Sequence, residues 1–284
     1  MLNVSQKGSV LEVDHPASDD WVMPRADIKK AEQFGMRLRG GGTHQSKTMM
    51  LAEISAYWGS SGMDPSRARS LIVDANALNK RTVSSRLLTF RHLNALYAIE
   101  TMPAITKTLT ALWKSDGKGR PLLALLCALA RDPLLRDSAI PVLHAPVGLA
   151  VRWPAIASVF ERKYTGRFSP KMLKSLAQNC VSTWTQSGHL RGAIKKQRVR
   201  AEPTPFGAAY AALIATVCGH GGPALLSSAW MEVLDVSSDR VLDLLRQAEG
   251  YGLTRIRSSG DVLEVSVRQP MSTTLRIAEL AQLR

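Results

Sequence analysis

Apolar side chains recur at every third or fourth position through most of the chain, which is the spacing of helices that bury one face. The clearest run extends from Leu173 to Trp184 and follows Ser169-Pro170, a pair that favours a helix start. Gly188 then supplies the residue type that commonly ends a helix. Similar patterns predict further helices over residues 27–39, 47–58, 64–76, 82–102, 103–114, 121–130, 133–144, 153–164, 206–218, 224–234 and 239–249.

The central part of the chain combines two such helices with a basic tail. The helices over 153–164 and 170–184 are followed by a basic stretch from Arg191 to Arg200, which two prolines close. Helix, turn, helix and then a hairpin is the order of a winged helix-turn-helix. We therefore expect this segment to form a winged-helix module.

A weaker copy of this order lies at the C-terminus. Residues 253–257 and 262–268 alternate apolar and polar side chains around Ser258-Ser259-Gly260-Asp261, a pattern typical of a β-hairpin. From residue 201 to residue 284 there are seven Arg, no Lys and nine acids, a net charge of −2. Because it lacks basic charge, this unit is predicted to pack or to contact proteins rather than to read DNA.

Together these elements predict a mainly α fold. It contains an N-terminal helical bundle, a central winged helix-turn-helix and a small C-terminal α+β unit that is winged-helix-like. The expected organisation is a flexible leader over 1–25, the bundle over 26–150, the basic winged-helix module over 151–205 and the helical and β-hairpin unit over 206–284.

Composition narrows the class of protein further. Hydrophobic residues make up 45% and aromatic residues 6% of the 284 residues, which excludes wholesale disorder and favours helices packed on helices. The cysteines (Cys127, Cys180 and Cys218) form no C-x-x-C pair, and so few of them fit a reducing, cytoplasmic compartment. The polar first 20 residues lack the pattern of a signal peptide. The apolar run over 121–130 is shorter than the roughly 20 residues of a membrane helix and is predicted to be a buried core helix.

The net charge of +14 is concentrated in one window. Between residues 162 and 200 the chain has ten basic residues and no acid: Arg162, Lys163, Arg167, Lys171, Lys174, Arg191, Lys195, Lys196, Arg198 and Arg200. Such asymmetry indicates a polyanionic partner, double-stranded DNA before a membrane surface. Charge alone does not distinguish DNA from structured RNA.

The predicted nucleic-acid contacts fall into three groups. The first is the start of the second helix of the module, and the second is the basic wing beyond it. The third is a smaller basic set before and within the helix over 82–102. The helix start contributes Lys171 and Lys174. The wing contributes Arg191, Lys195, Lys196, Arg198 and Arg200. The third group is Lys80, Arg81 and Arg86, with Arg91 nearby. Gln178 and Asn179 could read adenine edges if they faced a groove, or simply face solvent.

Nothing in the sequence argues for catalysis. Residues 41–48 are one glycine short of a P-loop, because Ser46 stands where the motif has Gly, and they are expected to form a hinge and then a capped helix. Asp261 and Glu264 lack the lysine of a metal-dependent nuclease, since Ser266 occupies its place. The six histidines show no metal-ligand spacing. We therefore expect neither metal nor cofactor, and no enzyme activity.

The order of several short patterns resembles the BrxA accessory proteins of bacterial BREX phage-defence systems. The patterns are Asn79-Lys80-Arg81-Thr82 with Ser84-Ser85-Arg86, the Leu-rich stretch from Leu122 to Leu135, Phe160, Ser169-Pro170-Lys171, Gln178-Asn179, Ser187-Gly188-His189-Leu190, and Ala208-Ala209-Tyr210 with Gly219. They span about residues 40 to 235, and the chain extends past this family core. The resemblance implies a mostly helical protein with a winged-helix part that binds DNA alongside other phage-defence proteins.

The sequence thus predicts a non-catalytic, cytoplasmic DNA-binding accessory protein of anti-phage defence, without membrane association. A winged-helix transcriptional regulator is the alternative, and it would bind a specific site, commonly as a dimer. Two further classes remain open. A nuclease or NTPase would show metal- or nucleotide-dependent turnover through Glu264 or Lys47. A scaffold would bind only acidic proteins or RNA through the basic window.

Overall fold

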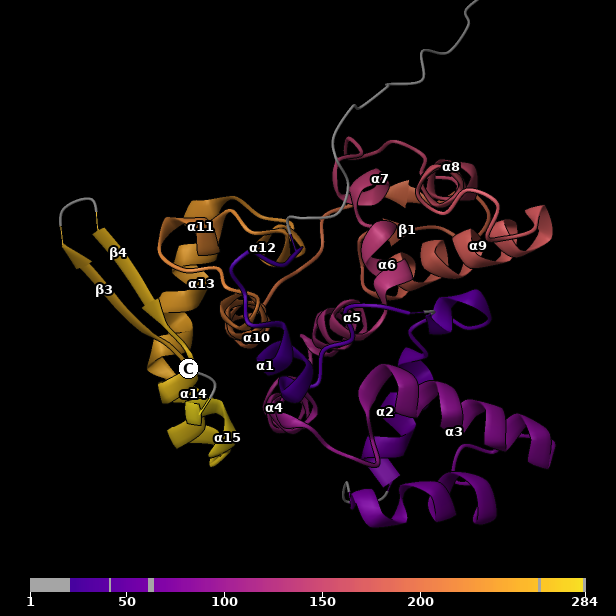
Figure 1. Cartoon of the computed structure of the whole chain (residues 1–284), viewed down its shortest axis with the longest axis horizontal. Coiled ribbons are helices and arrows are strands. Elements are labelled where there is room, and N and C mark those ends of the chain that lie inside the picture. Colours follow the sequence, from indigo (N-terminus) through magenta and orange to yellow (C-terminus); the bar gives the residue numbers. More distant parts are fainter. Residues whose placement is uncertain (1–20, 41, 61–63, 260–261, 283–284) are drawn as a thin grey trace, which may run out of the picture.

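The structure is a computed structural model that describes residues 21–40, 42–60, 64–259 and 262–282. It is mainly helical, and in the described part of the chain the strands form just two short antiparallel hairpins (Figure 1). The mainly α class predicted from the helical periodicity is confirmed.

The elements follow the predicted order closely. The N-terminal half contains α1 (Ile28–Phe34), η2 (Thr43–Gln45), α2 (Leu51–Ser60), η3 (Pro65–Arg67), η4 (Ser70–Asp74), α3 (Val83–Tyr97), α4 (Ala104–Ser115), α5 (Arg120–Arg131), α6 (Pro133–Asp137) and α7 (Ile140–Leu143). The central part contains α8 (Trp153–Lys163), α9 (Pro170–Gln186), β1 (Leu190–Arg191) and β2 (Gln197–Arg198). The C-terminal part contains α10 (Pro205–Val217), α11 (Pro223–Leu226), α12 (Ala229–Glu232), α13 (Ser238–Gly250), β3 (Arg255–Ser259), β4 (Val262–Ser266), α14 (Arg268–Leu275) and α15 (Glu279–Gln282).

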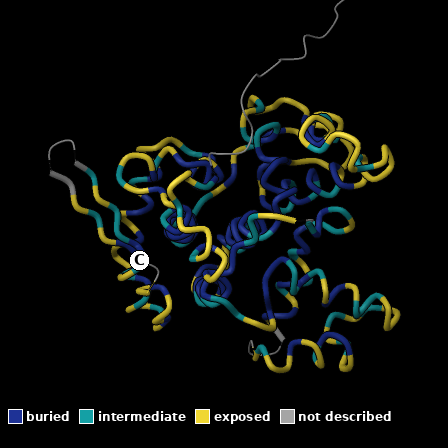
Figure 2. Tube along the Cα trace, in the orientation of Figure 1, coloured by how far each residue is buried: buried dark blue, intermediate teal, exposed yellow. Residues whose placement is uncertain are grey.

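Two apolar helices, α5 and α10, lie side by side at the centre of the molecule (Figure 1). Every residue of α5 from Leu122 to Ala130 is buried, which confirms the predicted core helix. No helix in the described part of the chain is long and apolar enough to cross a membrane. Figure 2 shows both central helices buried along their length, with exposed residues on the outer sides of α8 and α9. Buried side chains from Trp21 to Leu280 form one contiguous hydrophobic cluster.

Five predicted helices in the N-terminal half differ from the structure. The helix predicted over 27–39 ends at Phe34, where Gly35 has φ of 112°, and the helix predicted over 133–144 divides into α6 and α7. The helix predicted over 47–58 begins only at Leu51, and neither Thr43 nor Ser46 caps it, because the preceding residues bond to α9 instead. The segment predicted over 64–76 divides into a 3₁₀ turn and a π-helical turn. The helix predicted over 82–102 ends at Tyr97, since Ala98 takes a left-handed conformation with φ of 47°.

The predicted leader falls mostly outside the described residues. Residues 1–20 are not described, but Trp21 is already buried and packs edge-to-face on Trp230, with ring centroids 4.7 Å apart. The Nε1 of Trp230 also donates to the carbonyl of Trp21 at 2.7 Å. Packed structure therefore begins at least five residues before the predicted start of the bundle.

The C-terminal unit contains the predicted hairpin and two of the predicted helices, whereas the helix predicted over 224–234 divides into α11 and α12. Ser237 caps α13, which packs on α10, and β3 pairs with β4 so that Ile256 faces Val265. The hairpin projects from the body of the molecule (Figure 1). The second strand was expected to reach residue 268, but it ends at Ser266, and α14 and α15 follow where no helix was predicted.

Candidate nucleic-acid interface

Helix α9 presents a polar stripe to solvent. Ser169 caps its start by accepting the amide of Met172 at 3.3 Å, and Pro170 occupies the first helical position. Exposed side chains then recur at helical spacing along one side of the helix: Lys171, Lys174, Ser175 and Gln178. Two lysines therefore stand beside the positive end of the helix dipole, an arrangement that favours an anion.

The opposite face of α9 is fixed by apolar packing and by polar bonds. Leu176, Ala177, Cys180, Val181 and Trp184 are buried, as their spacing predicted, and Leu173 is half-buried. Four bonds join this face to residues 44–51, more than 130 positions earlier: Asn179 Nδ2 to His44 O at 2.9 Å, His44 Nε2 to Thr183 Oγ1 at 2.8 Å, Met49 N to Thr183 Oγ1 at 2.8 Å, and Leu51 N to Gln186 Oε1 at 3.2 Å. These bonds fix which side of α9 faces solvent. The Asn179 amide therefore bonds to His44 and is not free to contact a base, whereas Gln178 is exposed.

A buried relay extends this anchor to the start of α6. His44 Nδ1 lies 2.7 Å from Asp132 Oδ2, and Asp132 also accepts the amides of His44 and Leu134. Burial raises the pKa of the Asp132 carboxyl, but the charge and hydrogen bonds of His44 outweigh it and leave that pKa below its usual value. The order Asp132, His44, Thr183 matches that of a hydrolytic triad. However, His44 and Thr183 are both 0% exposed, so no substrate can reach the hydroxyl, and the relay is structural.

The basic wing forms a tight hairpin beside α9. Leu190 pairs with Arg198 and Arg191 with Gln197, and residues 148–151 pair with the outer side of β2 as a third extended segment. Gly192 has φ of 118°, and a Cβ placed there would lie 2.2 Å from the carbonyl oxygen of Lys195. The turn therefore requires glycine. Arg191 and Lys195 are exposed, and Lys196 is half-buried.

Arg198, one of the predicted nucleic-acid contacts, is buried in the structure. Its side chain is 1% exposed, and its two terminal nitrogens contact the two carboxylate oxygens of Asp235 at 2.6 and 2.7 Å. Burial raises the pKa of Asp235, but hydrogen bonds from Arg198, Ala201 and Arg200 outweigh it and lower the pKa overall. The prediction that Arg198 lies on the binding surface is wrong, because this ion pair holds the hairpin base against the residues after α12. Arg200 also contacts Asp235, at 2.7 Å, yet its side chain is 66% exposed.

Further cations flank α9 at the turn that precedes it. The guanidinium of Arg167 lies 5.1 Å from the ring centroids of Tyr164 and Phe168, which holds it at the surface of the turn. The Nζ of Lys174 lies 5.7 Å from the Trp153 ring. Lys163 is committed to the protein, since it contacts Asp137 at 2.5 Å.

The second basic set lies on another part of the molecule, next to the start of α3. Lys80 contacts Glu53 at 2.9 Å, and Arg86 is half-buried and donates to the carbonyl of Val73 at 3.3 Å. Arg81 and Arg91 are exposed. Two of the three predicted members therefore already have partners in the fold, and the structure does not join this set to the hairpin lysines.

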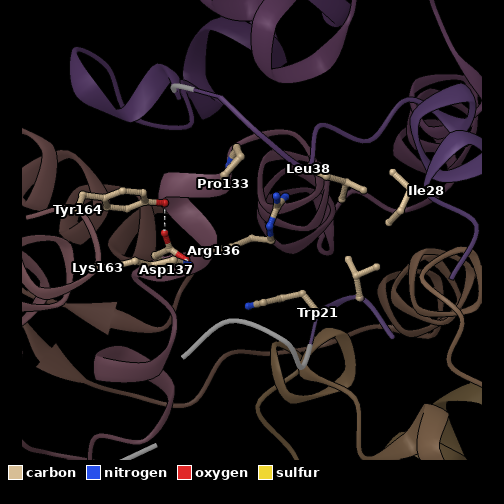
Figure 3. A pocket seen from close by; sticks show the side chains of 9 residues that line it. Trp21, Ile28, Leu38, Pro133, Arg136, Asp137, Lys163 and Tyr164 are labelled. Atoms are coloured by element: carbon tan, nitrogen blue, oxygen red, sulfur yellow. Dashed lines mark hydrogen bonds and ion pairs between the residues drawn. The ribbon is translucent and has the colours of Figure 1, made fainter. Parts of the chain in front are cut away.

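One cavity, of about 310 Å³, lies between α1, α6 and the end of α8 (Figure 3). Trp21, Ile28 and Leu38 form its apolar side. On the polar side Tyr164 donates to Asp137 at 2.6 Å, and both burial and this contact raise the pKa of Tyr164. The other charged groups of the lining, Lys163 and Arg136, also bond to protein groups, so the charged side chains of the cavity are all paired within the protein.

The described residues form neither a P-loop nor a cluster of metal ligands. Residues 43–45 of the P-loop-like stretch form a 3₁₀ turn, and Gly41 lies outside the described part. Glu264 is exposed on β4 and contacts Ser266 at 3.2 Å, whereas Asp261 is not described. Among described residues no group of three or more His, Cys, Asp or Glu could hold a metal ion.

Three features of this region were not predicted from the sequence. They are the buried relay through His44, the third extended segment at 148–151, and the exposed Ile194 at the tip of the hairpin. Of these features only Asp132 could have been identified from neighbouring residues, since an Asp followed by Pro is a common start of a helix. Comparison with protein-family models and with curated proteins finds no match to this chain.

Proposed function

We propose that this protein binds duplex DNA without catalysis, through a winged helix-turn-helix that extends the predicted module (151–205) back to residue 133. Helices α6 and α7, the segment 148–151, helices α8 and α9, and the β1–β2 hairpin follow the order of such a module. The observation that carries the proposal is the stripe of exposed cations at the start of α9, beside a hairpin that adds Arg191, Lys195 and Lys196.

The dimensions suit B-form DNA. A 17-residue helix is about 25 Å long, and the major groove is wide enough to admit one helix. With α9 in that groove, the hairpin lysines would lie along the neighbouring backbone. Each neutralised phosphate releases counterions, so the binding would weaken steeply as salt increases.

The exposed stripe favours weak sequence preference. It contains two lysines and Ser175, and Gln178 supplies a single amide suited to an adenine edge. This composition supports backbone binding more than the tight, specific site expected of a transcriptional regulator. The resemblance to BrxA supplies the proposed setting, an accessory role in anti-phage defence together with other defence proteins.

The test is fluorescence anisotropy of a labelled duplex over a range of salt. We compare the wild type with the double variant Lys195→Ala, Lys196→Ala. Arg198 is left intact, because it is buried against Asp235, and removing it would destabilise the hairpin without changing its exposed charge. The matched control is Lys114→Ala, Lys118→Ala, which removes two exposed lysines next to the end of α4.

We expect the hairpin variant to bind more weakly, with a plot of log K against log salt that is shallower by about 2. The control should behave like the wild type. A duplex RNA of the same sequence should bind less well, since its deep, narrow major groove does not admit α9. Failure of the wild type to bind DNA at low salt, or equal loss in the two variants, would contradict the proposal.

A further inference from the structure

The tip of the β1–β2 hairpin carries an isolated apolar side chain. Ile194 is 96% exposed, whereas the other exposed large hydrophobic residues in the described part range from 37% to 58%. An isoleucine held almost entirely in water contributes nothing to the core of this protein. It is therefore available to be buried by a partner.

The hairpin presents this side chain on a firm base. The turn is constrained by Gly192, whose left-handed conformation brings its α-carbon close to the carbonyl of Lys195. Below the turn, β2 is held on one side by β1 and on the other by residues 148–151. The buried ion pair between Arg198 and Asp235 fixes the far end of β2.

The surroundings of Ile194 indicate the chemistry of the partner. Lys195 follows it directly and is exposed, Arg191 lies at the end of β1, and Lys196 immediately precedes β2. The partner must therefore place negative charge around an apolar slot one side chain wide. Double-stranded DNA offers this combination, because phosphates line the minor groove and an apolar side chain can be inserted between base pairs. A membrane surface is a poorer fit, since anchoring to lipid takes a larger apolar area than one isoleucine provides.

On the basis of the DNA binding proposed above, we propose that Ile194 inserts between two base pairs from the minor groove and kinks the duplex. The lysines beside it bind the flanking phosphates while α9 occupies the neighbouring major groove. Insertion partly unstacks one base step, so pyrimidine–purine steps such as TA, which unstack most easily, are the preferred target. Kinks of this type measure roughly 20–90°.

The experiment measures bending and binding separately on one duplex. A DNA of about 24 base pairs with a central TA step carries donor and acceptor dyes at its two ends, so that energy transfer reports the bend. A second duplex carries a central mismatch, which removes part of the unstacking cost. The variants are Ile194→Ser, Ile194→Leu as the conservative replacement, and Ile28→Ser as a matched control on α1, where Ile28 is 43% exposed.

We expect the wild type, Ile194→Leu and Ile28→Ser to bend the duplex and to bind the mismatched duplex about tenfold more tightly than the matched one. Ile194→Ser should still bind, with its salt dependence intact, but neither bend the DNA nor prefer the mismatch. If the wild type binds DNA without bending it, or Ile194→Ser bends it equally, this inference fails while the DNA-binding function stands. If the wild type binds no DNA at low salt, both fail. Binding of phosphatidylglycerol vesicles that is lost in Ile194→Ser, with DNA bending unchanged, would instead assign the tip to membranes.

Discussion

The Oγ1 of Thr183 on α9 lies 2.8 Å from Nε2 of His44 and also accepts the amide of Met49 at 2.8 Å. The Met49 amide donates to this hydroxyl, which also bonds to the imidazole, and the other ring nitrogen of His44 contacts Asp132. One side chain thus satisfies two buried groups from a distant segment of the chain.

Thr183→Val keeps the shape of the side chain but removes both bonds. We expect it to lower the free energy of unfolding by about 1–3 kcal/mol, because a buried amide and imidazole lose their partner. Urea denaturation at pH 7 measures the change. Thr185→Val is the matched control, since that hydroxyl is half-buried on the same helix and donates to the Val181 carbonyl within it. If the two variants are equally stable, the relay does not anchor α9.

His189 should make the protein sensitive to mild acid. Burial lowers its pKa to about 4, and the neutral ring lies 2.9 Å from both Ser187 Oγ and the Val233 carbonyl. The unfolded chain protonates this ring near pH 6.5. Between these values the unfolded state binds a proton that the folded state excludes, so stability decreases as pH falls from 6.5 towards 4. The full effect is about 3 kcal/mol.

The measurement is the free energy of unfolding at pH 7 and at pH 5, for the wild type and for His189→Gln. The variant removes the titrating group and keeps a donor that can reach the Val233 carbonyl. Its stability should fall less between the two pH values than that of the wild type. Parallel curves for the two proteins would show that His189 does not control this part of the acid response.

The two arginines that contact Asp235 should contribute differently to stability, because one is buried and the other is exposed. Arg198→Ala leaves a buried carboxylate without its main partner, and we expect a loss of about 3 kcal/mol of stability. Arg200→Ala removes a largely exposed contact and should cost less than about 1 kcal/mol. Thermal denaturation of both variants checks this difference. A large loss in Arg200→Ala with a small one in Arg198→Ala would reverse our assignment of the hairpin anchor.

The parts of the candidate interface that could be predicted are those whose structure depends on neighbouring residues in the sequence. The start of α9 follows from Ser169-Pro170, its end from Gly188, and its buried face from spacing alone. The burial of Arg198 was not predictable, because it depends on Asp235, 37 positions later and beyond α10, α11 and α12. The role of Asn179 likewise depends on His44, which is 135 positions earlier. Residue type gave the chemistry of these side chains, but only the packed chain decides which of them face solvent.

The division of α9 into an anchored side and a free side has a consequence for how this protein can change. Asn179, Thr183 and Gln186 each bond to a distant segment of the chain, so substitutions at these positions lower the stability of the folded protein. The outward side chains bond to no distant segment, and apart from the contact of Lys174 with the Trp153 ring they face solvent, so they can be substituted one at a time. Selection for a different target should therefore collect changes at Lys171, Lys174, Ser175 and Gln178, and leave the scaffold behind them untouched.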